Sequence, residues 1–109
     1  MTVEDLIAKT GFNPTFLADK DREISGAYIG DLLSWVMGRA KADDAWITIM
    51  SNLNVIAVAT LADLACVIFA EGVVPDGELL RVAKEKGVNL ICTSLPSYEA
   101  AVKISEILK

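Results

Sequence analysis

The hydrophobic residues of this chain fall into short blocks separated by polar residues, and the spacing within the blocks predicts strands and helices in turn. The apolar blocks at 27–29, 45–50, 64–70 and 88–93 are short and largely uninterrupted, which is typical of buried strands. Between and after them, apolar residues recur at spacings of three and four, as on one face of a helix. From residue 27 onward the pattern therefore predicts four strand–helix pairs.

Helix boundaries are marked by capping residues and by glycine. Ser, Thr, Asp and Asn favour the N-cap because their side-chain oxygens accept hydrogen bonds from free backbone N–H groups. The predicted N-caps are Thr2 (with Asp5 three positions on), Asp31, Asn52 or Asn54, and Asp76. Gly11 and Gly87 are predicted to end the first helix and the helix that begins after residue 76. The last helix is expected within 94–109, with Pro96 in its first turn.

The part of the chain before residue 27 predicts the opening helix, a possible short strand at 15–18 and a charged surface turn at 19–23. Continuous apolar strands separated by helices indicate a parallel sheet covered on both faces. We therefore predict a single α/β domain over residues 1–109. Its architecture is a three-layer α/β/α structure with a mostly parallel sheet of four to five strands.

Composition and charge matter for the classes of protein that they exclude. The 109 residues are 53% hydrophobic and 23% charged, as in a globular rather than a disordered chain. Ten basic residues against fifteen acidic ones give a net charge of −5, so no nucleic-acid partner is expected. Residues 45–62 carry no charge, but five polar side chains interrupt them, so no membrane span is expected. The acidic start "MTVEDL" is unlike a secretory signal, and we expect a cytoplasmic protein.

Small polar residues follow the predicted strands, at the edge where an open α/β sheet binds ligands. The densest group, Ser51, Asn52 and Asn54, interrupts the most apolar stretch of the chain. Plain capping is the favoured interpretation of any single position, but one helix cap needs one such residue and not three, so the group as a whole favours ligand contact. The predicted ligand-binding residues are Asp31, Ser51, Asn52, Asn54, Thr93 and Ser94.

The signatures of the common enzyme classes are missing from the sequence. Neither a dinucleotide-binding GxGxxG nor a phosphate-binding GxxxxGK[ST] occurs, and there is no GxSxG. Without any His, neither a Ser-His-Asp triad nor a Cys/His zinc site can form. Cys66 and Cys92 lie in apolar runs and are expected as reduced core residues. We therefore predict no catalytic residue, no metal and no cofactor, with a small enzyme as the least favoured alternative.

The predicted helix "LLSWVMGRA" is apolar on more than one side. A helix of this kind needs a second surface to cover it, and Trp is frequent at protein interfaces. We predict a homodimer contact through Leu32, Trp35, Val36 and Met37, with burial inside the monomer as the equal alternative.

Two long segments, "GDLLSWVMGRAKADDAWITIMSNLNVIAVATLADLACVIFAEGVVPD" and "AKEKGVNLICTSLPSYEAA", resemble the DRTGG domain. The resemblance covers nearly the whole chain from Gly26 onward. This family includes stand-alone proteins and modules of phosphotransacetylases and of CBS-domain pyrophosphatases. Its fold is similar to that of the N-terminal domain of HPr kinase/phosphorylase.

The chain departs from the family pattern at the motif that gives the family its name. Where the pattern has an Asp-Arg pair between a strand and a helix, this sequence has Asn52 and Leu53. "DRE" at 21–23 lies in the charged turn, which is the wrong place. No phosphate-binding loop like that of the kinase is present, so the resemblance implies a regulatory module rather than a kinase.

Two functions remain open from the sequence. The first is a non-catalytic regulatory or ligand-sensing domain that binds an adenine nucleotide, which the resemblance suggests, or another small metabolite at the carboxyl edge of the sheet. The alternative is a stand-alone homodimeric interaction module without a ligand, which presents a surface to a larger partner enzyme.

Overall fold

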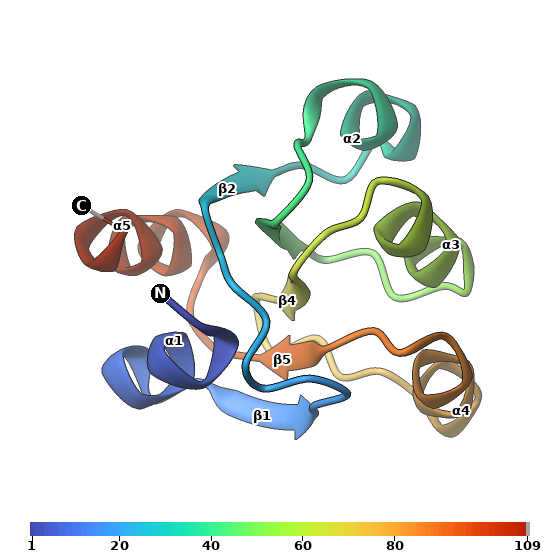
Figure 1. The fold of residues 1–109 in the computed structure, drawn as a ribbon, viewed down its shortest axis with the longest axis horizontal. Helices are drawn as coiled ribbons and strands as arrows, with labels where there is room; N and C mark the ends of the chain where they lie inside the picture. Colours follow the sequence, from blue (N-terminus) through green and yellow to red (C-terminus); the bar gives the residue numbers. More distant parts are fainter. Residues whose placement is uncertain (109) are drawn as a thin grey trace.

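A computed structural model describes residues 1–108 of the chain. It contains five helices and five strands, arranged as Figure 1 shows. The elements in chain order are α1 (Val3–Thr10), β1 (Asn13–Phe16), β2 (Gly26–Ile29), α2 (Leu33–Arg39), β3 (Asp44–Thr48), α3 (Asn54–Leu61), β4 (Cys66–Phe69), α4 (Gly77–Lys86), β5 (Leu90–Cys92) and α5 (Ser97–Ile107).

The five strands form one sheet in the order β1-β5-β4-β3-β2. Strands β2 to β5 are parallel and lie side by side in chain order, whereas β1 pairs antiparallel with β5. Because each parallel strand lies on the same side of the one before it, the right-handed crossovers place α2, α3 and α4 on one face. Helices α1 and α5 cover the other face (Figure 1). The predicted three-layer α/β/α fold with a mostly parallel sheet is confirmed.

Each face of the sheet has its own hydrophobic core. Every residue of β3, β4 and β5 is buried, as expected for strands covered on both sides. Since side chains alternate along a strand, Trp46 and Phe69 pack beneath α2, α3 and α4. Their neighbours Ile47 and Ile68 pack beneath α1 and α5.

Four of the predicted helix ends are confirmed by their hydrogen bonds. The Thr2 hydroxyl accepts from the N–H of Asp5, and the Asp5 carboxylate accepts from the N–H of Thr2, which forms a capping box. Asp76 accepts from the N–H of Leu79 at the start of α4. Gly11 and Gly87 end α1 and α4 with φ of 75° and 72°, in the left-handed region that glycine adopts without strain.

The caps predicted for the two central helices are wrong. The N-cap of α2 is Leu32, which provides no side-chain hydrogen bond, because the carboxylate of Asp31 binds the neighbouring strand instead. The N-cap of α3 is Leu53, and Asn54 is the first helical residue. Asn52 still contributes locally, since its Oδ1 accepts from the N–H of Asn54 at 2.9 Å.

Strand boundaries differ from the expected ones by one or two residues. The strand expected at 45–50 is β3 at Asp44–Thr48. It ends before Ile49 because the N–H of Ile49 donates a hydrogen bond to a side chain instead of to a neighbouring strand. The short strand expected at 15–18 is β1 at Asn13–Phe16. It contains Pro14, which a strand at the edge of a sheet tolerates.

The final helix, α5, ends at Ile107, and Pro96 is its N-cap residue rather than part of its first turn. Lys109, the last residue of the predicted helix, lies outside the described residues. Within residues 1–108, no helix has the length and the apolar character that a membrane crossing requires.

Candidate functional site

The polar residues that follow β3 reach the surface at the carboxyl edge of the sheet. Ser51, Asn52 and Asn54 are all exposed, whereas Val55 and Ile56 are buried in the next turn of α3. The expected opening of this segment at the rim of the sheet is therefore confirmed. Whether it binds a ligand is a separate question that depends on its surroundings.

A cleft of about 410 Å³ lies between the amino ends of α3 and α4. The two helices are adjacent because β3 and β4 are adjacent, so their N-termini lie side by side at the same edge (Figure 1). The cleft is lined by Ser51, Asn52, Leu53, Asn54, Asp76, Glu78 and Leu79.

Part of the polar lining is free to bind a ligand. Asn52 and Asp76 are engaged, since each accepts a hydrogen bond from the backbone of its own helix start. The side chains of Ser51 and Asn54 make no hydrogen bond within residues 1–108. A hydroxyl and an amide that are exposed in a cleft can donate to a ligand and accept from it.

The charge of the cleft is negative. Asp76 and Glu78 contribute carboxylates, and the lining includes neither Lys nor Arg. A phosphate placed among them would be repelled. Hydroxyl and amino groups of a ligand, by contrast, find acceptors in the carboxylate and amide oxygens.

The structure does not bring Asp31 into this cleft. Its Oδ1 accepts from the Thr48 hydroxyl at 2.8 Å and from the N–H of Ile49 at 3.0 Å. Asp31 therefore ties the end of β2 to the end of β3. Its ligand contact remains a prediction, without support from the geometry of the cleft.

Thr93 and Ser94 also lie outside the cleft, at the end of β5. The Thr93 hydroxyl accepts from the N–H of Leu95, and the Thr93 carbonyl accepts from the N–H of Gly72. The Glu71 carboxylate accepts from the N–H of Ser97 at 2.6 Å. These bonds fasten the loop after β4 to the loop after β5. The two loops are therefore held closed against each other at the point where α4 and α5 pass to opposite faces of the sheet.

Sequence reasoning missed Leu53, Glu78 and Leu79 as parts of the site and assigned Asp76 a capping role alone. The signal that would have found them is the order of the strands. When successive crossovers stay on one face, the N-terminus of each helix lies beside that of the next.

A family comparison agrees with this fold. The family model described as the DRTGG domain matches residues 18–107. The chain belongs to the DRTGG domain family. Among curated proteins, none matches this DRTGG domain.

A solved structure resembles the present chain, with a TM-score of 0.73 and 13% sequence identity. The similarity covers 94% of the present chain. The solved structure contains the CBS and DRTGG domains of the regulatory region of Clostridium perfringens pyrophosphatase, complexed with the activator diadenosine tetraphosphate. At this identity the likeness shows the fold. The present chain covers 45% of that chain, so it spans less than half of the length of this neighbour.

The apolar set predicted for a dimer contact does not form one surface of the DRTGG domain. Val36 is fully buried in the core under α2, so its predicted place in an interface is wrong. Trp35 and Met37 are 51% and 41% exposed. At about 100° per residue they point to nearly opposite sides of the helix. Trp35 stacks with the Arg39 guanidinium, 3.7 Å from the centre of its ring.

The two cysteines of the DRTGG domain are free and buried, as expected. Burial raises the pKa of the Cys66 thiol to about 12, so it stays protonated near neutral pH. A protonated thiol without access to solvent is a poor nucleophile. Cys66 therefore serves the core.

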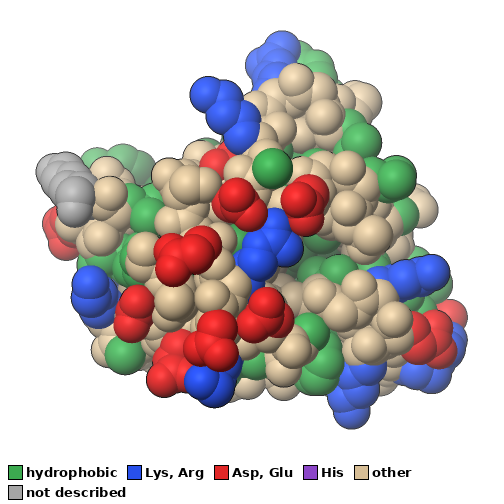
Figure 2. All heavy atoms as spheres, in the orientation of Figure 1, with side chains coloured by type: hydrophobic (Ala, Val, Ile, Leu, Met, Phe, Trp, Pro, Cys, Tyr) green, Lys and Arg blue, Asp and Glu red, His purple; other side chains and the backbone are tan. Residues whose placement is uncertain are grey.

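The amino ends of the strands carry a much denser set of charges than the cleft. Arg22 donates from Nη2 to Asp43 at 2.8 Å and to the carboxylate and carbonyl of Asp63 at 3.0 and 2.8 Å. Burial lowers the pKa of Arg22, but the bonds to the two carboxylates outweigh it and raise the pKa. Figure 2 shows acidic side chains gathered near the middle of this face, with basic ones among them.

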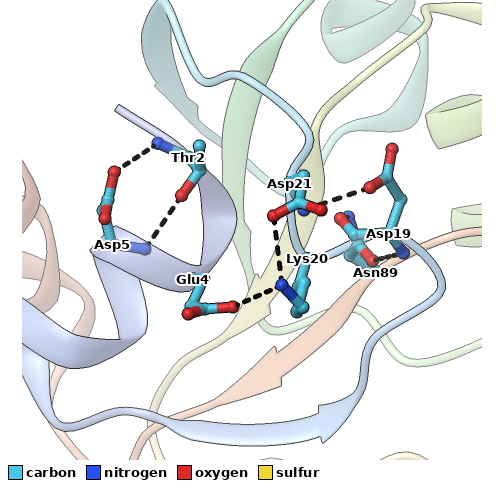
Figure 3. Close-up of polar contacts among 7 residues, drawn as sticks. All are labelled: Thr2, Glu4, Asp5, Asp19, Lys20, Asp21 and Asn89. Atoms are coloured by element: carbon cyan, nitrogen blue, oxygen red, sulfur yellow. Dashed lines mark hydrogen bonds and ion pairs between the residues drawn. The ribbon is translucent and has the colours of Figure 1, made fainter.

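Asn89 anchors the linker between β1 and β2 at the same end of the sheet (Figure 3). This side chain is almost fully buried. Its Oδ1 accepts from the N–H of Asp19 at 2.8 Å, and its Nδ2 donates to the carbonyls of Asp19 and Ala65 at 2.9 Å. Lys20 then pairs with Glu4 of α1, which holds the linker against the helix (Figure 3).

Proposed function

We propose that this DRTGG domain is a non-catalytic regulatory module that binds a small molecule in the cleft between the amino ends of α3 and α4. The observation that carries the proposal is the cleft itself. It combines the exposed, unengaged side chains of Ser51 and Asn54 with two helix N-termini at the carboxyl edge of a parallel sheet. In open α/β sheets this edge is where ligands bind.

An adenine nucleotide or a small uncharged metabolite fits the chemistry of this cleft. The regulatory region of the pyrophosphatase that shares the fold was solved with an adenine dinucleotide activator, which supports a nucleotide as the class of ligand. The acidic lining from Asp76 and Glu78 favours the adenine and ribose groups as the bound part, with any phosphate directed to solvent.

The test is thermal unfolding in the presence of adenosine, AMP or diadenosine tetraphosphate. A ligand that binds only the folded state stabilises it by about 2.7 kcal/mol at 100 times its Kd. For a domain of this size that free energy is a rise in Tm of roughly 10 °C. Adenosine is expected to give a shift at least as large as that of the polyphosphate, and the double variant Ser51→Ala/Asn54→Ala is expected to lose it.

The matched control is Ser34→Ala/Asn13→Ala, which removes the same two side-chain types from exposed positions outside the cleft. This control should keep the full shift. A wild-type protein whose Tm is unchanged by all three compounds, or a shift that survives loss of Ser51 and Asn54, contradicts the proposal. Loss of the shift in Ser94→Ala would extend the site to the end of β5.

The half-exposed Trp35 favours a second candidate function, a stand-alone homodimeric interaction module without a small-molecule ligand. Leu32, the N-cap residue of α2 three positions before Trp35, is 56% exposed. An apolar surface of this kind can serve a second copy of the chain or a larger partner enzyme. Binding of adenosine to the wild-type protein would contradict this candidate as the sole function.

A further inference from the structure

The two edge strands of the sheet differ in how they are protected from pairing with another chain. Strand β1 contains Pro14, and its register with β5 shifts between Asn13 and Phe16. Proline and an irregular register are devices that natural proteins use to block an exposed edge.

Strand β2 has none of these devices. Its four residues, Gly26–Ile29, are uncharged and pair with β3 in an unbroken register. It ends the sheet, so its outer edge has no neighbouring strand among the described residues. An unprotected edge strand is a template for a further strand.

Exposed apolar surface flanks β2 on both faces of the sheet. On the α5 face, a groove of about 350 Å³ runs beside Ile29 and is walled by Ala101 and Leu108 of the α5 segment. Ile29 is 46% exposed because α5 leaves it partly uncovered. On the α2 face, Leu32 and Trp35 are each about half exposed and pack against neither core.

The geometry of α2 directs Leu32 and Trp35 toward the free edge. With Arg39 they form one stripe at spacings of three and four. Leu33 and Met37 form the stripe on the other flank, and Leu33 packs against the core that α2 shares with α3. Because α3 lies on the β4 side of α2, the stripe with Trp35 faces the β2 side.

Charge and area both favour a second copy of this chain as the occupant. Between residues 24 and 42 the chain has two basic residues, Arg39 and Lys41, and one acidic residue, Asp31, which gives +1 in a chain of net charge −5. Two copies that meet here therefore bring little like charge together. A large side chain has about 200 Å² of surface when fully exposed, so the half-exposed Ile29, Leu32 and Trp35 together provide roughly 300 Å² of apolar surface that a partner can bury. The strand edge and the groove wall add to this toward the ~800 Å² per partner of a stable interface.

We propose that two copies of the chain pair through β2, antiparallel about a two-fold axis, to form one continuous ten-stranded sheet. A two-fold interface brings the same surface of both copies together. On one face, the stripe of Leu32 and Trp35 meets its equivalent in the second copy. On the other face, Ile29 and the groove beside α5 lie next to the same residues of the second copy, which cover them.

This interface deepens the second candidate function, and it lies apart from the cleft at Ser51 and Asn54. Its test is sedimentation equilibrium of the full chain from about 1 µM to about 1 mM, the range of weak to moderate affinities. The wild-type protein is expected to populate a dimer. Trp35→Ala and Ile29→Lys, which alter opposite faces of the sheet, are each expected to raise the dimer Kd at least about tenfold.

Met37→Ala and Leu61→Ala are the matched controls, because both side chains are exposed and apolar but lie away from β2. They should leave the Kd unchanged. Amide hydrogen exchange adds a second readout, since β2 is expected to be protected in the dimer and to exchange faster in the Trp35→Ala monomer. Circular dichroism establishes that each variant is folded.

A wild-type protein that stays monomeric throughout the concentration range overturns the proposal. So does a dimer that persists in both Trp35→Ala and Ile29→Lys, or one that only Met37→Ala disrupts. The adenosine shift of the cleft is measured independently, and neither variant touches the cleft, so failure of one proposal is distinguishable from failure of the other.

Discussion

The amino ends of the parallel strands and the cleft at their carboxyl ends use their polar side chains in opposite ways. At the amino end, side chains join loops that are far apart in sequence, as Arg22 does with Asp43 and Asp63. In the cleft at the carboxyl end, the side-chain hydrogen bonds of Asn52 and Asp76 each stay within one loop. Within residues 1–108, no ion pair lies in the cleft.

This difference separates stability from binding. A side chain whose hydrogen bonds are all made inside the protein has nothing left to offer a ligand, and its loss leaves partners unpaired. A side chain without partners contributes little to folding, but it can be used by a ligand. The amino end is therefore expected to set the stability of the domain, and the cleft its binding.

The largest expected effect is that of Asn89→Ala at the amino end. This change removes three hydrogen bonds and leaves the carbonyl of Ala65 without its buried partner. The free energy of unfolding is expected to fall by about 3 kcal/mol, measured by urea denaturation. Asn52→Ala at the carboxyl end, which loses one exposed local bond, should cost less than about 1 kcal/mol. Equal costs for the two variants would remove the proposed contrast.

Arg22→Met is expected to have an intermediate effect. Arg22 is partly exposed and Asp63 largely so, so the pairs are screened and their loss should cost only about 1 kcal/mol. The remaining carboxylates of Asp43 and Asp63 would then repel each other, and Asp63→Asn in the same background should recover part of the loss. Because salt screens exposed charges, the cost should shrink in 1 M NaCl, where the Debye length is about 3 Å. A cost that does not depend on salt would indicate lost packing instead.

The smallest expected effect is that of Ser51→Ala in the cleft. Its side chain makes no hydrogen bond within the described residues, so the free energy of unfolding should change by less than about 0.5 kcal/mol. Urea denaturation without ligand measures this directly. A loss above about 1 kcal/mol would mean that Ser51 belongs to the stabilising framework rather than to a binding surface.

The fold followed from the sequence because its signals are local. The uninterrupted apolar strands predicted a sheet buried on both faces, and Asp76 and Gly87 marked the ends of α4 correctly. Asp31 did not act as the predicted cap because Thr48 and the N–H of Ile49, seventeen and eighteen residues away, compete for its carboxylate. Such long-range partners are invisible to a local pattern.

The candidate site was predictable only in part for the same reason. Ser51, Asn52 and Asn54 could be predicted because they are polar residues within an apolar stretch. Asp76 and Glu78 joined them through the order of the strands, which the sequence pattern leaves open. The buried position of Val36 and the opposite directions of Trp35 and Met37 follow from helix geometry, which composition alone does not capture.

Because of the order of the strands, all residues that line the cleft come from one continuous segment of the chain. Both walls of the cleft come from one uninterrupted stretch, from Ser51 to Leu79, with β4 at its centre. Arg22 and Asn89 lie outside that stretch. If the proposed ligand binds in the cleft, exchanging this one segment between relatives is expected to transfer ligand preference as a unit, while the recipient keeps its own framework.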